Sequence, residues 1–346
     1  MSLVPTAILK AIVKVAKDKG FQRFEGRLPN FGAIQAALDN TQLLVPATQL
    51  EAARKAPQHP VEIPVMQAYD ATLLTARACV TSPDTVTTAL FPLTWNTTGF
   101  VIKEFGTGVY EQNYYSKDEH FAHQLSQGLK AAFLKIETDL IAFLETNKSA
   151  VNESPLFPTV DADARVVLNA DRLKFYRSIE AIMSRNDLPQ EGILDITNTE
   201  SVIEYQFIGA QGQANSTNTA YQIRSVVPYR TNRISPTVDF DEIHYLIAPG
   251  GIGMLTWNSP DFRANDKVSE AEYLTTIADP VFGFTWDLKV DKKCENLNAI
   301  YAGHTVSITS QYSFYVDYSF LTSYLSETDA SVILKYVIAN AEYTPA

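Results

Sequence analysis

The longest helical pattern in the chain begins just after Ser116. Its apolar residues recur at steps of three and four positions, which places them on one face of a helix. They are Phe121, Leu125, Leu129, Phe133, Ile136, Leu140 and Leu144. Ser116 and Glu119 have the spacing of a capping box, in which each side chain bonds a free N–H at the helix start. The pattern predicts one helix over residues 117–146, roughly 45 Å long and suited to a scaffold role.

Shorter patterns predict the other elements. Two further helices are expected over residues 6–19 and 171–183, the second with Leu173, Tyr176, Ile179 and Ile182 on one side. Residues 28–60 look irregular, with a short apolar patch at 31–38. Pro64 indicates an edge strand or an extended arm rather than a central strand. Short β-like runs are expected within 61–109 and at 193–197, 204–210, 243–249, 281–290, 304–318 and 332–338. This order predicts an α+β chain without visible repeats.

The composition indicates a protein with part of its surface covered by binding partners. Charged residues make up 19% of the 346 residues, below the usual share of about 25%. The chain also has 17 Tyr and 18 Phe, which suit either interface cores or a β-rich interior. Both interpretations of the aromatic residues stay open.

The net charge of −11 disfavours nucleic acid as the main ligand of the exposed surface. Residues 1–27 are different, because they carry six basic and two acidic side chains and a net charge of +4, which leaves −15 on the rest. The helix expected at 6–19 has Ile8, Ile12 and Val15 on one face and lysines opposite. Such a helix could lie on a membrane, but we favour packing on its own assembly.

No pattern indicates secretion or membrane insertion. Lysines interrupt the apolar residues near Met1, as a signal peptide would not allow, and no window approaches about 18 apolar residues. Cys79 and Cys294 form neither a disulfide framework nor a zinc motif, so buried thiols are expected. The chain is expected to be made and folded in a cytoplasm.

Two histidines near the start of the expected long helix are candidate metal ligands. His120 and His123, beside Glu119, have a spacing that could place two imidazoles on one helix face for a metal. No third ligand follows from the sequence, and Glu119 already has a capping role. Solvated helix positions are therefore the preferred interpretation of both histidines.

The remaining candidates are weaker. The segment APGGIGM follows an apolar run, as a phosphate-binding loop would, but lacks the Gly-Lys-Ser/Thr of a P-loop, so a tight turn is expected. No Ser or Cys lies in a glycine elbow. The acid pairs Asp161 with Asp163 and Asp239 with Asp241 fit solvated loops. The sequence thus predicts no enzyme, and no catalytic, cofactor-binding or metal-binding residues.

The order of the elements resembles the major capsid protein of tailed bacteriophages, the Hong Kong ninety-seven type of fold. TARACV, TTALFPLTW and GFVIKEF are similar to strands before the family's spine helix, and FAHQLSQGLKAAFLKIETDLIAFLETNKSAV resembles that helix. FYRSIEAIMSRNDLP resembles the helix and loop that lead into its apical domain. ITNTESVIEYQFIGAQGQANSTN and IHYLIAPGGIGMLTWNSPDF are similar to that domain's strands and loops, and WDLKVDKKC resembles the return to the peripheral domain. The resemblance covers most of residues 70–320 as a pattern.

This resemblance implies a domain organisation and a function. It implies an N-terminal arm (1–55), an extended β-loop with leading strands (56–110), a peripheral domain with the spine helix (111–170), an apical domain (171–280) and returning peripheral strands (281–346). The function implied is self-assembly into an icosahedral head that encloses double-stranded DNA. Many copies would form hexamers and pentamers.

The same resemblance implies partners and a location. Minor capsid, portal or scaffolding proteins are expected as partners, with non-specific contact to packaged DNA and no membrane. The chain would be assembled in the host cytoplasm and reside in the virion. Two alternatives remain: another repetitive phage or contractile-injection subunit (sheath or tube), and a hydrolase with a site assembled from distant residues.

Overall fold

The computed structural model describes residues 31–66, 88–104, 117–161, 164–214, 225–269, 271–295, 307–323 and 330–343. Its helical elements are α2 (Gly32–Leu44), α3 (Ala47–Arg54), α4 (Lys117–Thr146), η3 (Asn169–Asp171), α5 (Arg172–Arg185), α6 (Thr199–Ala214) and α7 (Pro260–Ala264). Its strands are β1 (Glu62–Met66), β2 (Thr88–Pro92), β3 (Asn96–Glu104), β4 (Val160–Asp161), β5 (Ala164–Val167), β6 (Ile193–Thr197), β7 (Val226–Arg230), β8 (Phe240–Ile247), β9 (Ile252–Trp257), β10 (Glu272–Ala278), β11 (Thr285–Glu295), β12 (Ser307–Thr322) and β13 (Ile333–Ala339). The α+β class expected from the sequence is confirmed.

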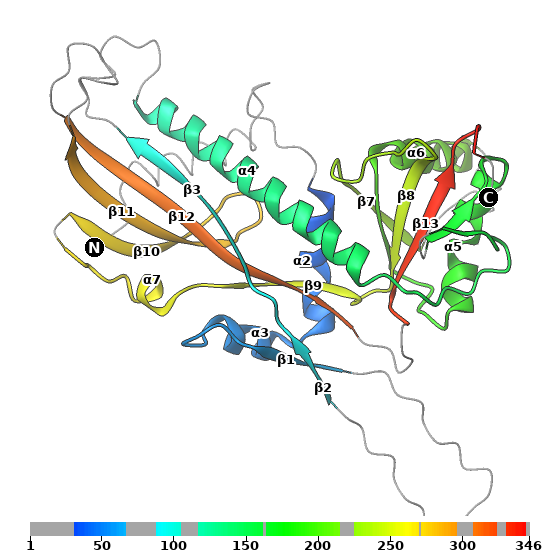
Figure 1. Cartoon of the computed structure of the whole chain (residues 1–346), viewed down its shortest axis with the longest axis horizontal. Coiled ribbons are helices and arrows are strands. Elements are labelled where there is room, and N and C mark those ends of the chain that lie inside the picture. The colour runs from blue at the N-terminus through cyan, green and yellow to red at the C-terminus, as the bar shows by residue number, and fades with distance from the viewer. Residues whose placement is uncertain are drawn as a thin grey trace, which may run out of the picture.

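One lobe of the molecule is a five-stranded antiparallel sheet that α4 crosses (Figure 1). The strands run in the order β10-β11-β12-β3, and β9 pairs with the far end of the long strand β12. The helix predicted over residues 117–146 is confirmed with the same bounds. Every apolar residue predicted on its inner face is buried, from Phe121 to Leu144.

A glycine allows α4 to approach the sheet closely. Gly128 lies against the ring of Phe100 on β3, and a Cβ atom at this position would collide with that ring. The Phe100 ring in turn stacks on Phe314 of β12, with 4.7 Å between the ring centroids. The absent side chain of Gly128 therefore makes room for an aromatic layer between helix and sheet.

The second lobe is a six-stranded mixed sheet in the order β4-β5-β13-β8-β6-β7. β13 pairs with β5 in parallel and β6 pairs with β7 in parallel, while the other pairs are antiparallel. Helices α5 and α6 pack beside each other here, with Tyr176 against Tyr205 at 4.8 Å between ring centroids. All five residues of β6 are buried, as expected for an inner strand.

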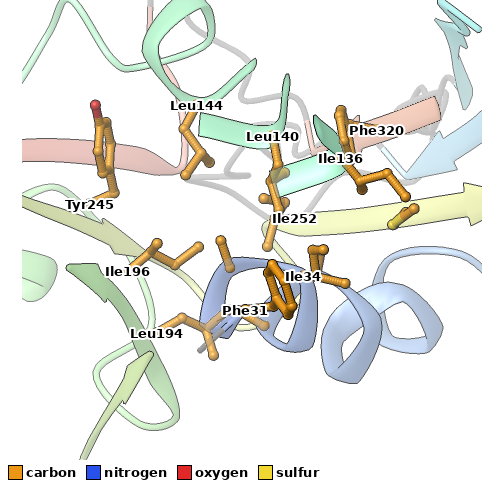
Figure 2. Close-up of a cluster of buried hydrophobic side chains, with 14 of the residues drawn as sticks. Phe31, Ile34, Ile136, Leu140, Leu144, Leu194, Ile196, Tyr245, Ile252 and Phe320 are labelled. Atoms are coloured by element: carbon orange, nitrogen blue, oxygen red, sulfur yellow. The ribbon is translucent and has the colours of Figure 1, made fainter. Parts of the chain in front are cut away.

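Helix α2 lies between the two lobes and joins their cores (Figure 1). Figure 2 shows Phe31 and Ile34 between side chains of both lobes: Ile136, Leu140 and Leu144 come from α4, and Leu194 and Ile196 come from β6. Ile34, Ala33, Ala36 and Ala37 are fully buried. Small residues let α2 sit close to its neighbours, so one continuous apolar core links the lobes.

The expectation that residues 28–60 are irregular is wrong for the described part of that range, because α2 and α3 occupy most of it. Alanine has the highest intrinsic helix propensity, and the apolar patch at 31–38 is the buried face of α2. The prolines at 46 and 57 flank α3 rather than disrupt it: Pro46 precedes its first residue and Pro57 follows its end.

A second correction concerns residues 204–210, which the sequence predicts as a strand and which lie within α6. Tyr205 and Ile208 face the core of the lobe, whereas Ile203 and Phe207 are exposed. Because apolar residues lie on both sides of this helix, its sequence shows no helical periodicity. Leu173 is also misplaced by the prediction, since 48% of its surface is exposed at the start of α5.

The other predicted strands correspond to β6, β8, β11, β12 and β13, although β11 begins only at Thr285. Strand pairing groups these elements differently from the expected segments. β9 and β10 belong to the sheet of β11, β12 and β3, and β13 belongs to the six-stranded sheet. Pairing between distant strands is not encoded in local patterns. The helix expected at 6–19, the run at 75–80 and Ser116 lie outside the described residues.

Candidate assembly surfaces

A cluster of ionisable side chains is buried inside the second lobe. Asp195 of β6 and Glu242 and His244 of β8 are fully buried. His244 Nδ1 lies 2.8 Å from Asp195 Oδ2, and His244 Nε2 lies 3.4 Å from Glu242 Oε2. Each ring nitrogen of His244 therefore faces a buried carboxyl group.

Hydroxyl groups and an arginine complete this cluster. Tyr205 donates to Asp195 Oδ2 at 2.6 Å, and Tyr176 donates to Glu242 Oε2. The Arg172 guanidinium pairs with Glu242 and, at 3.3 Å, with Glu204. Burial raises the pKa of the Tyr205 hydroxyl, and the Asp195 charge raises it further. A carboxylate beside a histidine is a catalytic arrangement elsewhere, but here both ring nitrogens are occupied, so the cluster holds α5 and α6 to the sheet.

The histidines singled out in the sequence lie on the first turns of α4. His120 is partly buried and His123 is exposed, and the Ser126 hydroxyl donates to the His123 carbonyl oxygen at 2.8 Å. In the part of the chain that the structure describes, no group of three or more His, Cys, Asp or Glu side chains is placed to hold a metal ion.

The glycine-rich segment forms the turn between β8 and β9, as expected. Gly250 has a φ of 72°, a conformation that glycine adopts without strain. Its N–H donates to Asn40 Oδ1 at 3.3 Å, so the turn is fixed against α2. A strand, β9, follows this turn immediately, whereas a phosphate-binding loop leads into a helix.

The remaining candidates are scattered. Asp161, Asp239 and Asp241 are exposed, and Asp163 lies outside the described residues. Cys294 lies on β11, and Cys79 is not in a described range. Among the helices that the structure describes, none combines the length and the apolar character needed to span a bilayer.

An extended arm leaves the five-stranded lobe at its base. It consists of β1 and β2, which form a two-stranded antiparallel sheet of their own (Figure 1). Ile63 and Phe91 face inward and pack with Leu255 and Leu321 of the sheet. On the other side Leu90 is 57% exposed. Within the described residues β1 and β2 pair only with each other, so each presents a strand edge.

The root of this arm is held by an imidazole between two indole rings. His59 stacks on Trp95 at 5.0 Å between ring centroids and meets Trp257 at 4.1 Å. His59 Nε2 lies 2.9 Å from Asp317 Oδ2, and the Thr97 hydroxyl donates to Asp317 Oδ1 at 2.5 Å. We call His59, Trp95, Trp257 and Asp317 the arm root. Its members come from both legs of the arm and from β9 and β12.

Backbone contacts support the arm root. The Trp95 indole donates to the Pro60 carbonyl at 2.8 Å, which ties the outgoing leg of the arm to the returning one. The Ala56 carbonyl accepts from both Trp257 Nε1 and Arg263 Nη2, at 3.1 and 2.8 Å. The arm therefore leaves the body in a defined direction rather than from a loose hinge.

Apolar side chains are also exposed at one edge of the second lobe. Ile203 and Phe207, four residues apart on α6, are 60% and 54% exposed. Val227 on the edge strand β7, which contacts α6, is 45% exposed. We call these three residues the α6–β7 patch. Large apolar residues on an edge strand and its covering helix are typical of surfaces that contact another protein.

Sequence reasoning missed both the arm root and the α6–β7 patch. Trp95 and Trp257 could be noticed as rare residues, but only strand pairing brings them to the same imidazole. The patch carried a visible signal, because the apolar run EYQFIGA was recognised and assigned to a strand. Its assignment to a helix is what places Ile203 and Phe207 on one exposed face.

Comparison with solved structures finds capsid proteins. The chain is similar to the capsid of the cyanophage P-SCSP1u, with 12% identity over 81% of this chain and 83% of that one and a TM-score of 0.44. It is similar to the capsid of Ralstonia phage GP4, with 8% identity over 82% and 84% and a TM-score of 0.40. It is also similar to the encapsulin SrpI of Synechococcus elongatus PCC 7942, with 11% identity over 75% and 79% and a TM-score of 0.37. No protein-family model and no curated protein matches the sequence.

Proposed function

We propose that this chain is the major capsid protein of a tailed bacteriophage, a structural subunit that assembles into an icosahedral head around double-stranded DNA. The observation that carries the proposal is the combination of a 30-residue helix laid along a sheet, a second lobe and an extended two-stranded arm. This is the set of elements that the sequence resemblance implies for the family. The buried position of the ionisable cluster, whose side chains bond one another, supports a structural rather than an enzymatic role.

In this proposal the two sheets and the two-stranded arm correspond to the parts of a capsid subunit. The five-stranded sheet with α4 forms the peripheral part of the subunit, and the six-stranded sheet with α5 and α6 forms the apical part. β1 and β2 form the extended loop that reaches a neighbouring subunit. In this proposal β9 and β10, which pair within the five-stranded sheet, are assigned to the peripheral part, and β13, which pairs within the six-stranded sheet, is assigned to the apical part.

Further partners and the location belong to the same proposal. Portal, minor capsid or scaffolding proteins would contact the shell, and the basic residues among 1–27 would meet packaged DNA non-specifically. Assembly would take place in the host cytoplasm. The acidic remainder of the chain limits the affinity of other surfaces for DNA.

Electron microscopy of the chain expressed alone tests the proposed function directly. We expect closed particles with icosahedral symmetry, built from hexamers and pentamers. Filaments or stacked rings would instead identify a sheath or tube subunit. A monomer that hydrolyses ester, peptide or glycoside substrates would overturn the structural assignment.

The α6–β7 patch gives a sharper test of how the subunits meet. We expect Phe207→Glu to leave the subunit folded, because exposed substitutions shift the free energy of unfolding by less than about 0.5 kcal/mol. Particle formation should fail, because the added charge would be buried against a second copy of the chain. The control Gln206→Glu adds the same charge at an exposed polar position of α6. Normal particles from Phe207→Glu would exclude the patch from the subunit contacts.

A further inference from the structure

A buried carboxyl group lies where α4, α2 and the segment after β7 meet. Glu137 of α4 is 1% exposed, although its neighbours one turn away are apolar: Phe133, Leu134, Leu140 and Ile141. Its Oε1 accepts a hydrogen bond from the Ala33 N–H at 3.2 Å. Ala33 is in the first turn of α2, where no side chain of α2 itself caps the free amides. Glu137 therefore caps one helix from another.

The third element at this point comes from the second lobe. Thr231, which follows β7, is fully buried, and its side chain and the exposed Arg233 both act on the Glu137 carboxyl. The Thr231 N–H donates to the Thr197 carbonyl of β6 at 3.0 Å, and Thr231 forms a β-bridge with Phe31. The carboxyl of Glu137, on α4, thus lies against the start of α2 and against the segment after β7, which is bonded to the six-stranded sheet.

We propose that Glu137 is a proton-controlled joint between the two lobes. With the carboxyl neutral, α2 and the Thr231 segment close against α4. With the carboxyl ionised, a charge is confined at a position that is 1% exposed and where, within the described residues, Glu137 Oε2 has no hydrogen-bond partner, so the contact loosens. A second tie between the lobes does not titrate in this way: Glu145 of α4 bonds Tyr245 at 2.7 Å and Lys335 at 2.9 Å, on β8 and β13.

The electrostatic balance at Glu137 supports this behaviour. Burial raises the pKa of its carboxyl from 4.5 to about 7, against the opposing effects of Thr231, the Ala33 amide and Arg233. At Glu145 burial also acts to raise the pKa, but Lys148, Tyr245 and Lys335 outweigh it and lower the pKa to about 2. Glu145 therefore stays ionised at every pH at which Glu137 changes its charge.

The sign of the pH effect follows from the raised pKa of Glu137. Between pH 4.5 and about 7 the closed joint binds a proton that an opened, solvated Glu137 would release. Closure is therefore most stable at the acidic end of this range. It weakens as the pH rises and changes no further above about pH 7.

Hydrogen exchange of the full-length chain, in its unassembled form, tests the joint. After correction for intrinsic exchange, protection of the backbone amides of residues 33–37 should fall by about tenfold or more between pH ~5.5 and ~8. Glu137→Gln keeps the acceptor for Ala33 and cannot ionise, so its protection should be high and independent of pH. The control Glu191→Gln removes an exposed carboxyl and should behave as the wild type.

Two results would overturn this proposal. One is equal protection of residues 33–37 in the wild type at both pH values. The other is a pH dependence that persists in Glu137→Gln. Both concern a single subunit, so they are independent of whether the chain builds a shell.

Discussion

At the scale of single residues, the buried polar groups are the feature that sequence reasoning could not reach. Asp195 and His244 lie 49 positions apart and meet only because β6 and β8 are paired. Along the sequence each looks like an isolated polar residue within an apolar strand. Buried charges are tolerated when they are paired and hydrogen-bonded, so the cost of burial explains why these partners must all be present.

Removing one charge from this cluster should therefore lower the free energy of unfolding strongly. We expect Asp195→Asn to destabilise the chain by about 3 kcal/mol, because it removes a buried carboxyl group that both His244 and Tyr205 contact. The midpoint of urea unfolding measures this loss. Asp241→Asn changes an exposed carboxylate on the neighbouring strand β8 and should shift unfolding by less than about 0.5 kcal/mol. Equal midpoints for the two variants would show that the buried cluster does not stabilise the fold.

At the scale of elements, a helix with apolar residues on one face was predictable from the sequence, and a helix with apolar residues on two faces was not. α4 is buried along a single face, so its periodicity gave the correct bounds at both ends. α6 has apolar residues toward the core and toward solvent, so its periodicity disappears and the apolar run is mistaken for a strand. The failure at α6 coincides with the α6–β7 patch, where exposed apolar residues suit a contact between subunits rather than the fold of one subunit.

The inner face of α4 can be tested by one substitution and its neighbour. Leu129 is 2% exposed, and we expect Leu129→Asp to prevent folding or assembly, because an unpaired buried charge costs several kcal/mol. Ala131→Asp introduces the same side chain two residues later, at an exposed position, and should fold and assemble. Circular dichroism and particle yield measure both variants. Normal particles from Leu129→Asp would contradict the packing of α4 on the sheet.

At the scale of the whole molecule, the sequence predicted the parts but not how they are joined. The order of strands, spine helix and second lobe was recognisable, because each depends on local patterns or on resemblance. The connections depend on distant pairs: β13 returns to β5 and β8, α2 wedges between the lobes, and the arm root gathers residues from 59 to 317. An assembling subunit needs these joints, since they fix where its contact surfaces point.

The arm root provides the test at this scale. His59→Ala removes the contact with Asp317 and the ring between Trp95 and Trp257, while the inner face of the arm, Ile63 and Phe91, stays packed. The subunit should therefore remain folded, with little change in its thermal unfolding, but the arm should lose its fixed direction. Because a closed shell requires every subunit to present its contacts at the same angle, we expect the yield of closed particles to fall severalfold.

His123→Ala makes the same substitution at an exposed position of α4 and should give wild-type yields. Electron microscopy and sedimentation of assembled material compare the two, and equal yields would show that assembly does not depend on the direction of the arm.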